Sequence, residues 1–122
     1  MGISLSIQDE LEELKKQIDL RVNISGPSSW VIRGLIEDVD EYVISSLDML
    51  IGENLPNDLE YEILEDKNLC SIDSREPDCE DTLVIAIYRV EEKDPIAYIV
   101  YDRIIGDNTY EFRLRKIILK QT

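Results

Sequence analysis

The residues that come nearest to a catalytic pattern are two carboxylates and a lysine in the second half of the chain. Pro77-Asp78 is followed after twelve residues by Glu91-Glu92-Lys93, which matches the letters of a PD…ExK metal-dependent nuclease motif. In that chemistry Asp78 and Glu91 would bind one divalent ion while Lys93 steadies the attacking water. A carboxylate-based, metal-dependent nuclease is therefore one candidate function.

The element between these carboxylates argues against a shared ion. Residues 83–90 carry no turn signal and read as one strand, so thirteen steps of about 3.3 Å place Asp78 and Glu91 roughly 40 Å apart. Two ligands of one ion lie within about 5 Å of each other. The ExK letters also recur by chance at residues 13–15 and 65–67. We keep the nuclease as a remote alternative and predict no catalytic residues and no metal.

The chain contains no histidine, which removes Ser–His and Cys–His nucleophile pairs and imidazole metal ligands. Its two cysteines, Cys70 and Cys79, are too few for a zinc site and lack the C-x-x-C spacing of a redox pair. A disulfide and two free thiols both remain open. The acidic loop around them lacks the ligand spacing and central glycine of an EF-hand. We expect a non-enzymatic protein without a cofactor.

The net charge of −14 is unevenly distributed along the chain. Residues 1–81 contain 21 acidic and 6 basic residues, whereas residues 82–122 contain 6 acidic and 7 basic ones. Such a field repels nucleic acid and anionic membranes and attracts basic proteins. Plain solubility explains an acidic surface equally well. The partner that we expect is a basic, nucleic-acid-binding protein, with no direct nucleic acid or membrane contact.

Ten acidic residues are the candidates for contact with such a partner. They lie in a predicted helix, in a predicted strand and in a polar loop. They are Glu37, Asp38, Asp40, Glu41, Glu60, Glu62, Glu76, Asp78, Glu80 and Asp81. Because Glu37 and Glu41 are one helical turn apart, they share a face. The competing interpretation is an outer face that is merely solvated.

Apolar periodicity predicts two N-terminal helices. The first covers residues 6–23, with Ser6 as its N-cap. The second covers residues 29–51, between a cap at Ser28 or Ser29 and Gly52. The apolar side of the first is Ile7, Leu11, Leu14, Ile18 and Val22, and that of the second is Ile32, Leu35, Ile36, Val39, Val43, Leu47 and Leu50. Gly34 costs a helix about 1 kcal/mol relative to Ala, which predicts a close packing contact there.

The rest of the chain reads as strands. They are predicted at Leu59–Ile63, Thr82–Val90, Ile96–Ile105 and Thr109–Leu119, with a polar loop over residues 66–81. Short turns make neighbouring strands antiparallel. The predicted class is α+β, one domain over residues 1–122 with two helices packed on a four-stranded antiparallel sheet (ααββββ).

Two of these strands are apolar on both faces, at residues 83–88 and 96–101. A strand with one wet face should alternate. Either helices cover both faces of the sheet, or the second face meets another chain. We favour the second alternative, which predicts a homodimer through the sheet.

Composition adds a prediction about the source. The 18 isoleucines against two alanines are typical of an AT-rich genome and fit a thermophilic archaeon or one of its viruses. Residues 1–5 lack the basic start and apolar core of a signal peptide, and no apolar run approaches the roughly 20 residues that span a bilayer. We therefore expect a cytoplasmic protein.

A small acidic α+β chain without catalytic residues has the profile of immunity proteins, antitoxins and viral inhibitors of host defence. The sequence thus predicts a non-catalytic inhibitor that occludes a basic surface of a nucleic-acid-handling protein. It would act as a nucleic acid mimic, with carboxylates standing where phosphates would sit. An acidic chaperone, adaptor or assembly subunit is the alternative.

Overall fold

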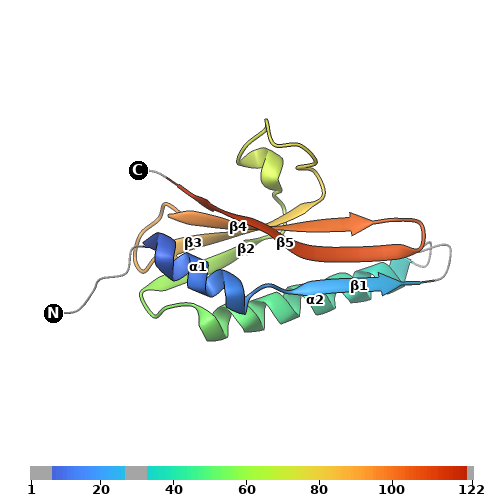
Figure 1. Cartoon of the computed structure of the whole chain (residues 1–122), viewed down its shortest axis with the longest axis horizontal. Coiled ribbons are helices and arrows are strands. Elements are labelled where there is room, and N and C mark those ends of the chain that lie inside the picture. The colour runs from blue at the N-terminus through green and yellow to red at the C-terminus, as the bar shows by residue number, and fades with distance from the viewer. Residues whose placement is uncertain (1–6, 27–32, 121–122) are drawn as a thin grey trace.

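Five strands form one antiparallel sheet in the computed structural model, which describes residues 7–26 and 33–120 (Figure 1). The strands are β1 (Arg21–Ser25), β2 (Leu59–Leu64), β3 (Thr82–Arg89), β4 (Ala97–Ile105) and β5 (Thr109–Leu119). Their order across the sheet is β1-β5-β4-β3-β2. The predicted α+β class and the antiparallel sheet are confirmed, but the described residues form five strands rather than four.

The additional strand lies where the sequence predicts the end of the first helix. Helix α1 spans Ile7–Gln17, and β1 follows it after residues 18–20. Val22 fits a helical stripe, but it also alternates with Ile24, which is the pattern of a half-buried strand. Pairing with β5, in which Val22 lies opposite Phe112, satisfies the backbone of this segment and favours the strand.

Helix α2 (Arg33–Asn54) connects the two edge strands across one face of the sheet (Figure 1). It buries Val43, Leu47 and Ile51 against that face. Leu35, which the sequence places in the core, is 38% exposed instead. The predicted caps at Ser6, Ser28 and Ser29 lie outside the described residues.

The two glycines of α2 have the opposite roles to those predicted. Gly52 lies inside the helix and not after its end, and a Cβ there would be 3.3 Å from the Tyr61 hydroxyl. At Gly34 a Cβ would meet nothing within 4 Å. The close approach is therefore at Gly52. The helix ends where the Asn54 side chain donates to the Leu50 carbonyl at 2.8 Å.

Both helices lie on one face of the sheet, and the main core fills the space between them. The buried hydroxyl of Tyr101 donates to the carbonyl of Ile18 at 2.6 Å, which ties the end of α1 to the central strand β4. The ring of Tyr101 stacks on Phe112 with centroids 5.0 Å apart. Burial, followed by the charge of Asp19, raises the pKa of Tyr101 well above its usual value.

Residues 65–81, here called the covering loop, lie on the opposite face of the sheet (Figure 1). The loop contains a short 3₁₀ helix, η1 (Leu69–Ser71), and it packs Leu69 and Cys79 against Val84 and Val100. The sequence left two alternatives for this second apolar face, a helix layer or another chain. A loop of the same chain covers Val84 and Val100 instead.

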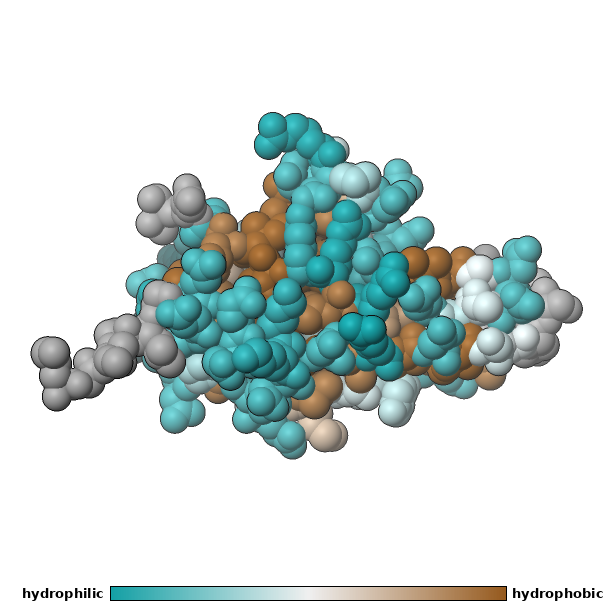
Figure 2. Space-filling view, viewed as in Figure 1, coloured by the Kyte–Doolittle hydropathy of each residue, from teal (hydrophilic) through white to brown (hydrophobic). Residues whose placement is uncertain are grey.

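The covering loop leaves only part of the second face accessible to the second copy of the predicted homodimer. Figure 2 shows apolar surface between the covering loop and α1. Tyr88, Tyr98 and Ile118 are half-buried on the second face. If a second copy packs there, light scattering at tens of micromolar should give twice the mass of the chain, and Tyr98→Lys should restore the monomer. A monomeric mass for the unchanged protein would contradict the dimer.

Candidate functional site

The ten acidic residues singled out in the sequence do not form one surface. Glu37, Asp38 and Glu41 are exposed on α2, on one face of the sheet. Residues 76–81 belong to the covering loop on the other face, and residues 60–62 lie on β2 at its edge. A single flat partner surface therefore cannot contact all ten.

A disulfide closes the covering loop between Cys70 and Cys79, whose Cα atoms are 5.1 Å apart. At the base of the loop the buried hydroxyl of Thr82 accepts a hydrogen bond from the Leu69 amide at 2.7 Å. The same hydroxyl donates to the Cys79 carbonyl at 2.8 Å. Both ends of the loop are thus fixed to the start of β3.

Removing this disulfide should destabilise the protein. For the double variant Cys70→Ser, Cys79→Ser we expect the free energy of unfolding to fall by about 2.5 kcal/mol, because the cross-link restricts the unfolded chain over a loop of about ten residues. Urea denaturation measures this, and the unchanged protein in reductant should match the variant. Alkylation should add mass only after reduction, and labelling without reductant would contradict the bond.

An irregularity in the sheet places an arginine under this loop. Val100 pairs with Lys116 and Tyr101 with Leu114, so Arg115 is an extra residue on β5 without a partner on β4. Such a bulge redirects a side chain and increases the local twist. Here it accompanies a side chain that reaches across to the covering loop.

The guanidinium of Arg115 joins the loop to the sheet. It donates to the carbonyls of Pro77 at 2.7 Å and Asp78 at 3.1 Å. It also pairs with Asp102 of β4 at 3.1 Å and with Glu76 at 3.3 Å. The Arg115 side chain is only 17% exposed. Charge-assisted bonds to four acceptors make this arginine the main polar connection of the loop.

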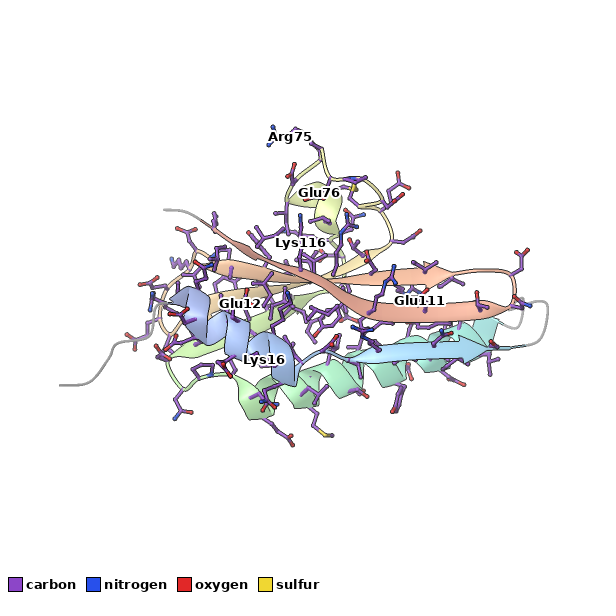
Figure 3. The ribbon with its side chains drawn as sticks, viewed as in Figure 1. Glu12, Lys16, Arg75, Glu76, Glu111 and Lys116 are labelled. Carbon is purple, nitrogen blue, oxygen red and sulfur yellow. A yellow bond between two sulfur atoms is a disulfide. The ribbon has the colours of Figure 1, made fainter. Side chains whose placement is uncertain are left out.

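Glu76 is the loop carboxylate that these contacts neutralise. It pairs with both Arg115 and Lys116, and Figure 3 shows it above Lys116 of β5. Arg75, its neighbour, projects from the tip of the loop instead. Glu76 is therefore a structural residue in this fold, and the partner-binding proposal below does not depend on it.

An open cleft of about 750 Å³ lies between the covering loop and the sheet. It is lined by Glu76, Asp78, Cys79, Glu80, Asp81, Asp102, Ile104, Arg113 and Arg115. Asp78, Glu80 and Asp81 are exposed and form no ion pair with any described residue. Arg113 pairs with Glu111 at 3.2 Å. The structure thus gathers four of the ten predicted residues at this cleft, three of them unpaired.

The second acidic surface is the exposed part of α2, here called the outer face of α2. Its exposed carboxylates are Glu37, Asp38, Glu41, Asp48 and Glu53. Residues 34–54 contain no Lys or Arg. Only Asp48 has a partner among the described residues, the Tyr61 hydroxyl at 2.5 Å. Like charges one turn apart destabilise a helix by a few tenths of a kcal/mol, at most about 0.5 kcal/mol per pair.

Asp40 lies on the opposite side of α2 and points toward the sheet. It accepts two hydrogen bonds from Arg103 of β4, one of them at 2.9 Å, and one from the Tyr110 hydroxyl of β5 at 2.9 Å. Burial and the bond to Asp40 raise the pKa of Tyr110 to about 12. Asp40 therefore holds the helix on the sheet, and its carboxylate is not available to a partner.

The tyrosines should make the protein unstable in alkali. The bond to Asp48 raises the pKa of Tyr61 to about 12, as burial does for Tyr110. Since the unfolded state releases these protons from about pH 10, the free energy of unfolding should fall between pH 10 and 12, on the order of 2 kcal/mol for Tyr110. Urea denaturation at rising pH measures this. Tyr110→Phe should have a shallower decline, and an equal decline would contradict the assignment.

The nuclease-like carboxylates lie at opposite ends of β3. Asp78 precedes this eight-residue strand and Glu91 follows it. Eight extended residues span about 26 Å. This placement agrees with the expectation that the two cannot share an ion. Among residues 7–26 and 33–120, no group of three or more His, Cys, Asp or Glu side chains is arranged to hold a metal.

Some contacts and exposed positions of these surfaces are not predicted by the sequence. Asp102 and Arg115 meet only because of the bulge in β5, which has no local sequence signal. Leu35, Tyr42 and Met49 on α2 are exposed, and their spacing of seven residues is visible in the sequence. That spacing could have separated them from the core positions.

Comparisons with known protein families, with curated proteins and with solved structures find no match to this chain. Over the described residues, none of the helices has the length and apolar character that crossing a membrane would require. Fold and surface together define an α+β protein with two acidic surfaces on opposite faces of its sheet.

Proposed function

We propose that the protein is a non-catalytic inhibitor or antagonist that binds a basic, nucleic-acid-handling protein through the outer face of α2. The observation that carries this proposal is the charge of that face. It has five exposed carboxylates, no Lys or Arg between residues 34 and 54, and only one carboxylate with a described partner. Unpaired like charges on a helix are unfavourable for folding, and a basic partner would offset that cost.

The geometry of the face supports nucleic acid mimicry. A helix of 22 residues is about 33 Å long. Glu37 and Glu41 lie about 6 Å apart along it, which is of the same order as the charge spacing along one nucleic acid strand. A groove that neutralises phosphates would receive a similar row of charges from this helix. Occupation of that groove is the inhibitory step that we propose.

An acidic chaperone, adaptor or assembly subunit is the second candidate. Tyr42 and Met49 are each 64% exposed on the outer face of α2, and an adaptor needs such apolar contact area. Salt separates the two candidates, because attraction between exposed charges weakens as salt is added whereas apolar contact does not.

The test is capture of the partner from the native cell with three forms of the protein. The first is unchanged, the second carries Glu37→Gln, Asp38→Asn and Glu41→Gln, and the third carries Glu60→Gln and Glu62→Gln as a control on β2. The unchanged and control forms should retain a basic protein, and the α2 variant should lose it. While it is bound to the unchanged protein, the captured protein should no longer bind nucleic acid.

Two results would contradict the proposal. One is equal capture by the α2 variant. The other is a complex that resists salt between about 0.05 and 0.5 M, a range over which phosphate-type contacts weaken by orders of magnitude. The second result would favour the adaptor.

A cytoplasmic, archaeal or viral origin is part of the same proposal. The disulfide between Cys70 and Cys79 would be unusual in an ordinary cytosol. Intracellular proteins of hyperthermophiles are an exception, being rich in disulfides. The bond and the isoleucine-rich composition together favour a thermophilic source.

A further inference from the structure

An apolar stripe runs along the outer face of α2, between its carboxylates. Leu35 is 38% exposed, and Tyr42 and Met49 are 64% exposed each. Successive residues of this set are seven apart, and seven residues bring an α-helix back to within about 20° of the same direction. The three side chains therefore form one line about 21 Å long.

The stripe is open to a partner. No described element covers this side of α2, which faces away from the sheet (Figure 1). The other exposed large apolar side chains of the described residues are Val90, Ile104, Ile105 and Leu119, which lie on strands or turns and not on a helix. Of the exposed apolar residues in the described ranges 7–26 and 33–120, only those on α2 share a regular helical spacing.

Carboxylates lie beside the apolar stripe on the surface of α2. Asp38 lies between Leu35 and Tyr42 on the helix surface, and Glu53 follows Met49 by one turn. No cation of residues 34–54 interrupts this arrangement. A ligand for the face must therefore present apolar side chains in a line and positive charges beside them.

We propose that the outer face of α2 binds a basic amphipathic helix of the partner protein. Apolar residues at seven-residue spacing supply one of the two positions in each heptad at which paired helices contact each other, where side chains of one helix fill the spaces of the other. A line of about 21 Å matches about four turns of such a helix. The proposal rests on the proposed function and adds the shape of the basic segment.

Charge excludes the other obvious occupants. A second copy of α2 would bring two rows of carboxylates together, and like charges across a helix pair are repulsive. An anionic lipid surface or a nucleic acid would be repelled for the same reason. A helix with Lys or Arg on both sides of its apolar stripe supplies both the line of apolar side chains and the positive charges that this face requires. Basic helices are also the elements with which many proteins contact nucleic acid.

The experiment uses two synthetic peptides of about three heptads. The first has Leu at positions a and d and Lys at e and g, where Lys also repels other copies of the peptide. The second has the same composition in an order that gives no apolar stripe. We expect the first peptide to bind more tightly by about tenfold, and to gain helical circular dichroism signal on binding.

Matched variants locate the binding. Tyr42→Ser with Met49→Ser should weaken binding of the striped peptide about tenfold and leave the second peptide unaffected. Val90→Ser with Ile104→Ser removes two exposed apolar side chains elsewhere, 42% and 45% exposed, and should change neither. Circular dichroism of each variant alone checks that it is folded. Chemical shift changes in the unchanged protein should map to α2.

The outcomes separate this inference from the proposed function. Equal binding of both peptides, or loss of binding in the Val90 and Ile104 variant, overturns the helix inference. The proposed function still stands in those cases if Glu37→Gln, Asp38→Asn and Glu41→Gln weaken both peptides. If that variant binds both peptides as well as the unchanged protein, the acidic face is not the binding surface and both proposals fail.

Discussion

Replacing Asp40 with alanine should lower the free energy of unfolding by about 3 kcal/mol, whereas Glu41→Ala beside it should change it by less than about 0.5 kcal/mol. Asp40 accepts bonds from Arg103 and Tyr110 under α2. Without Asp40, the half-buried guanidinium keeps its charge and loses its counter-charge. Glu41 is exposed and forms no ion pair with a described residue. Urea denaturation of the two variants measures the difference.

A double-mutant cycle tests the cause. Arg103→Met alone should also destabilise the protein, but Asp40→Ala with Arg103→Met should cost less than the sum of the two, because neither charge is then left unpaired. Additive losses would mean that the pair does not act as a unit. Equal losses for Asp40→Ala and Glu41→Ala would show that α2 is not oriented as described.

The periodicity of a helix is enough to predict from the sequence that Asp40 faces the sheet and that Glu41 does not. Asp40 lies three residues before Val43 and seven before Leu47, so it shares their side of the helix. Glu37 and Glu41 are exposed instead, because they lie farther round the helix from Val43 and Leu47. Grouping the four carboxylates by adjacency in the chain therefore mixed an inward residue with outward ones, whereas sorting by face would have separated them.

The start of the first helix can be predicted from local periodicity, but its end cannot. The apolar stripe of residues 7–18 is strong enough to predict α1 locally. The segment after it is ambiguous, because Val22 and Ile24 fit a strand and Val22 also fits the helix. The ladder to β5, almost ninety positions away, decides between them. Periodicity in one window carries no information about such a partner.

The strands predict an apolar second face of the sheet, but not the loop that covers part of it. Val84 and Val100 need burial, and that need is visible in the strands. Their cover is a polar loop that supplies only a few apolar residues, chiefly Leu69 and Cys79, held in place by a disulfide. Because most residues of the loop are polar, its composition predicts a loop that is exposed to solvent along its whole length.

Replacing Arg115 with alanine should cost about 3 to 4 kcal/mol and release the covering loop, whereas Arg113→Ala should cost less than about 0.5 kcal/mol. Arg115 is bonded to two loop carbonyls and to Asp102 and Glu76. Its loss removes the donor of the two loop carbonyls and the counter-charge of Asp102, which is only 20% exposed, whereas Glu76 keeps its pair with Lys116. Arg113, two residues away, is 52% exposed, and its one ion pair with a described residue is to Glu111 at the surface.

Urea denaturation gives the stability of both Arg variants, and amide hydrogen exchange shows where the Arg115 variant opens. Exchange should rise first at Leu69, whose amide bonds to Thr82 at the base of the loop, while α2 stays protected. Because the disulfide restrains the same loop, Arg115→Ala should cost less when the bond between Cys70 and Cys79 is intact than when it is reduced. Equal costs in both redox states would mean that the guanidinium and the disulfide stabilise the loop independently. If exchange rises equally in α2 and in the loop, Arg115 stabilises the whole fold and not the loop in particular.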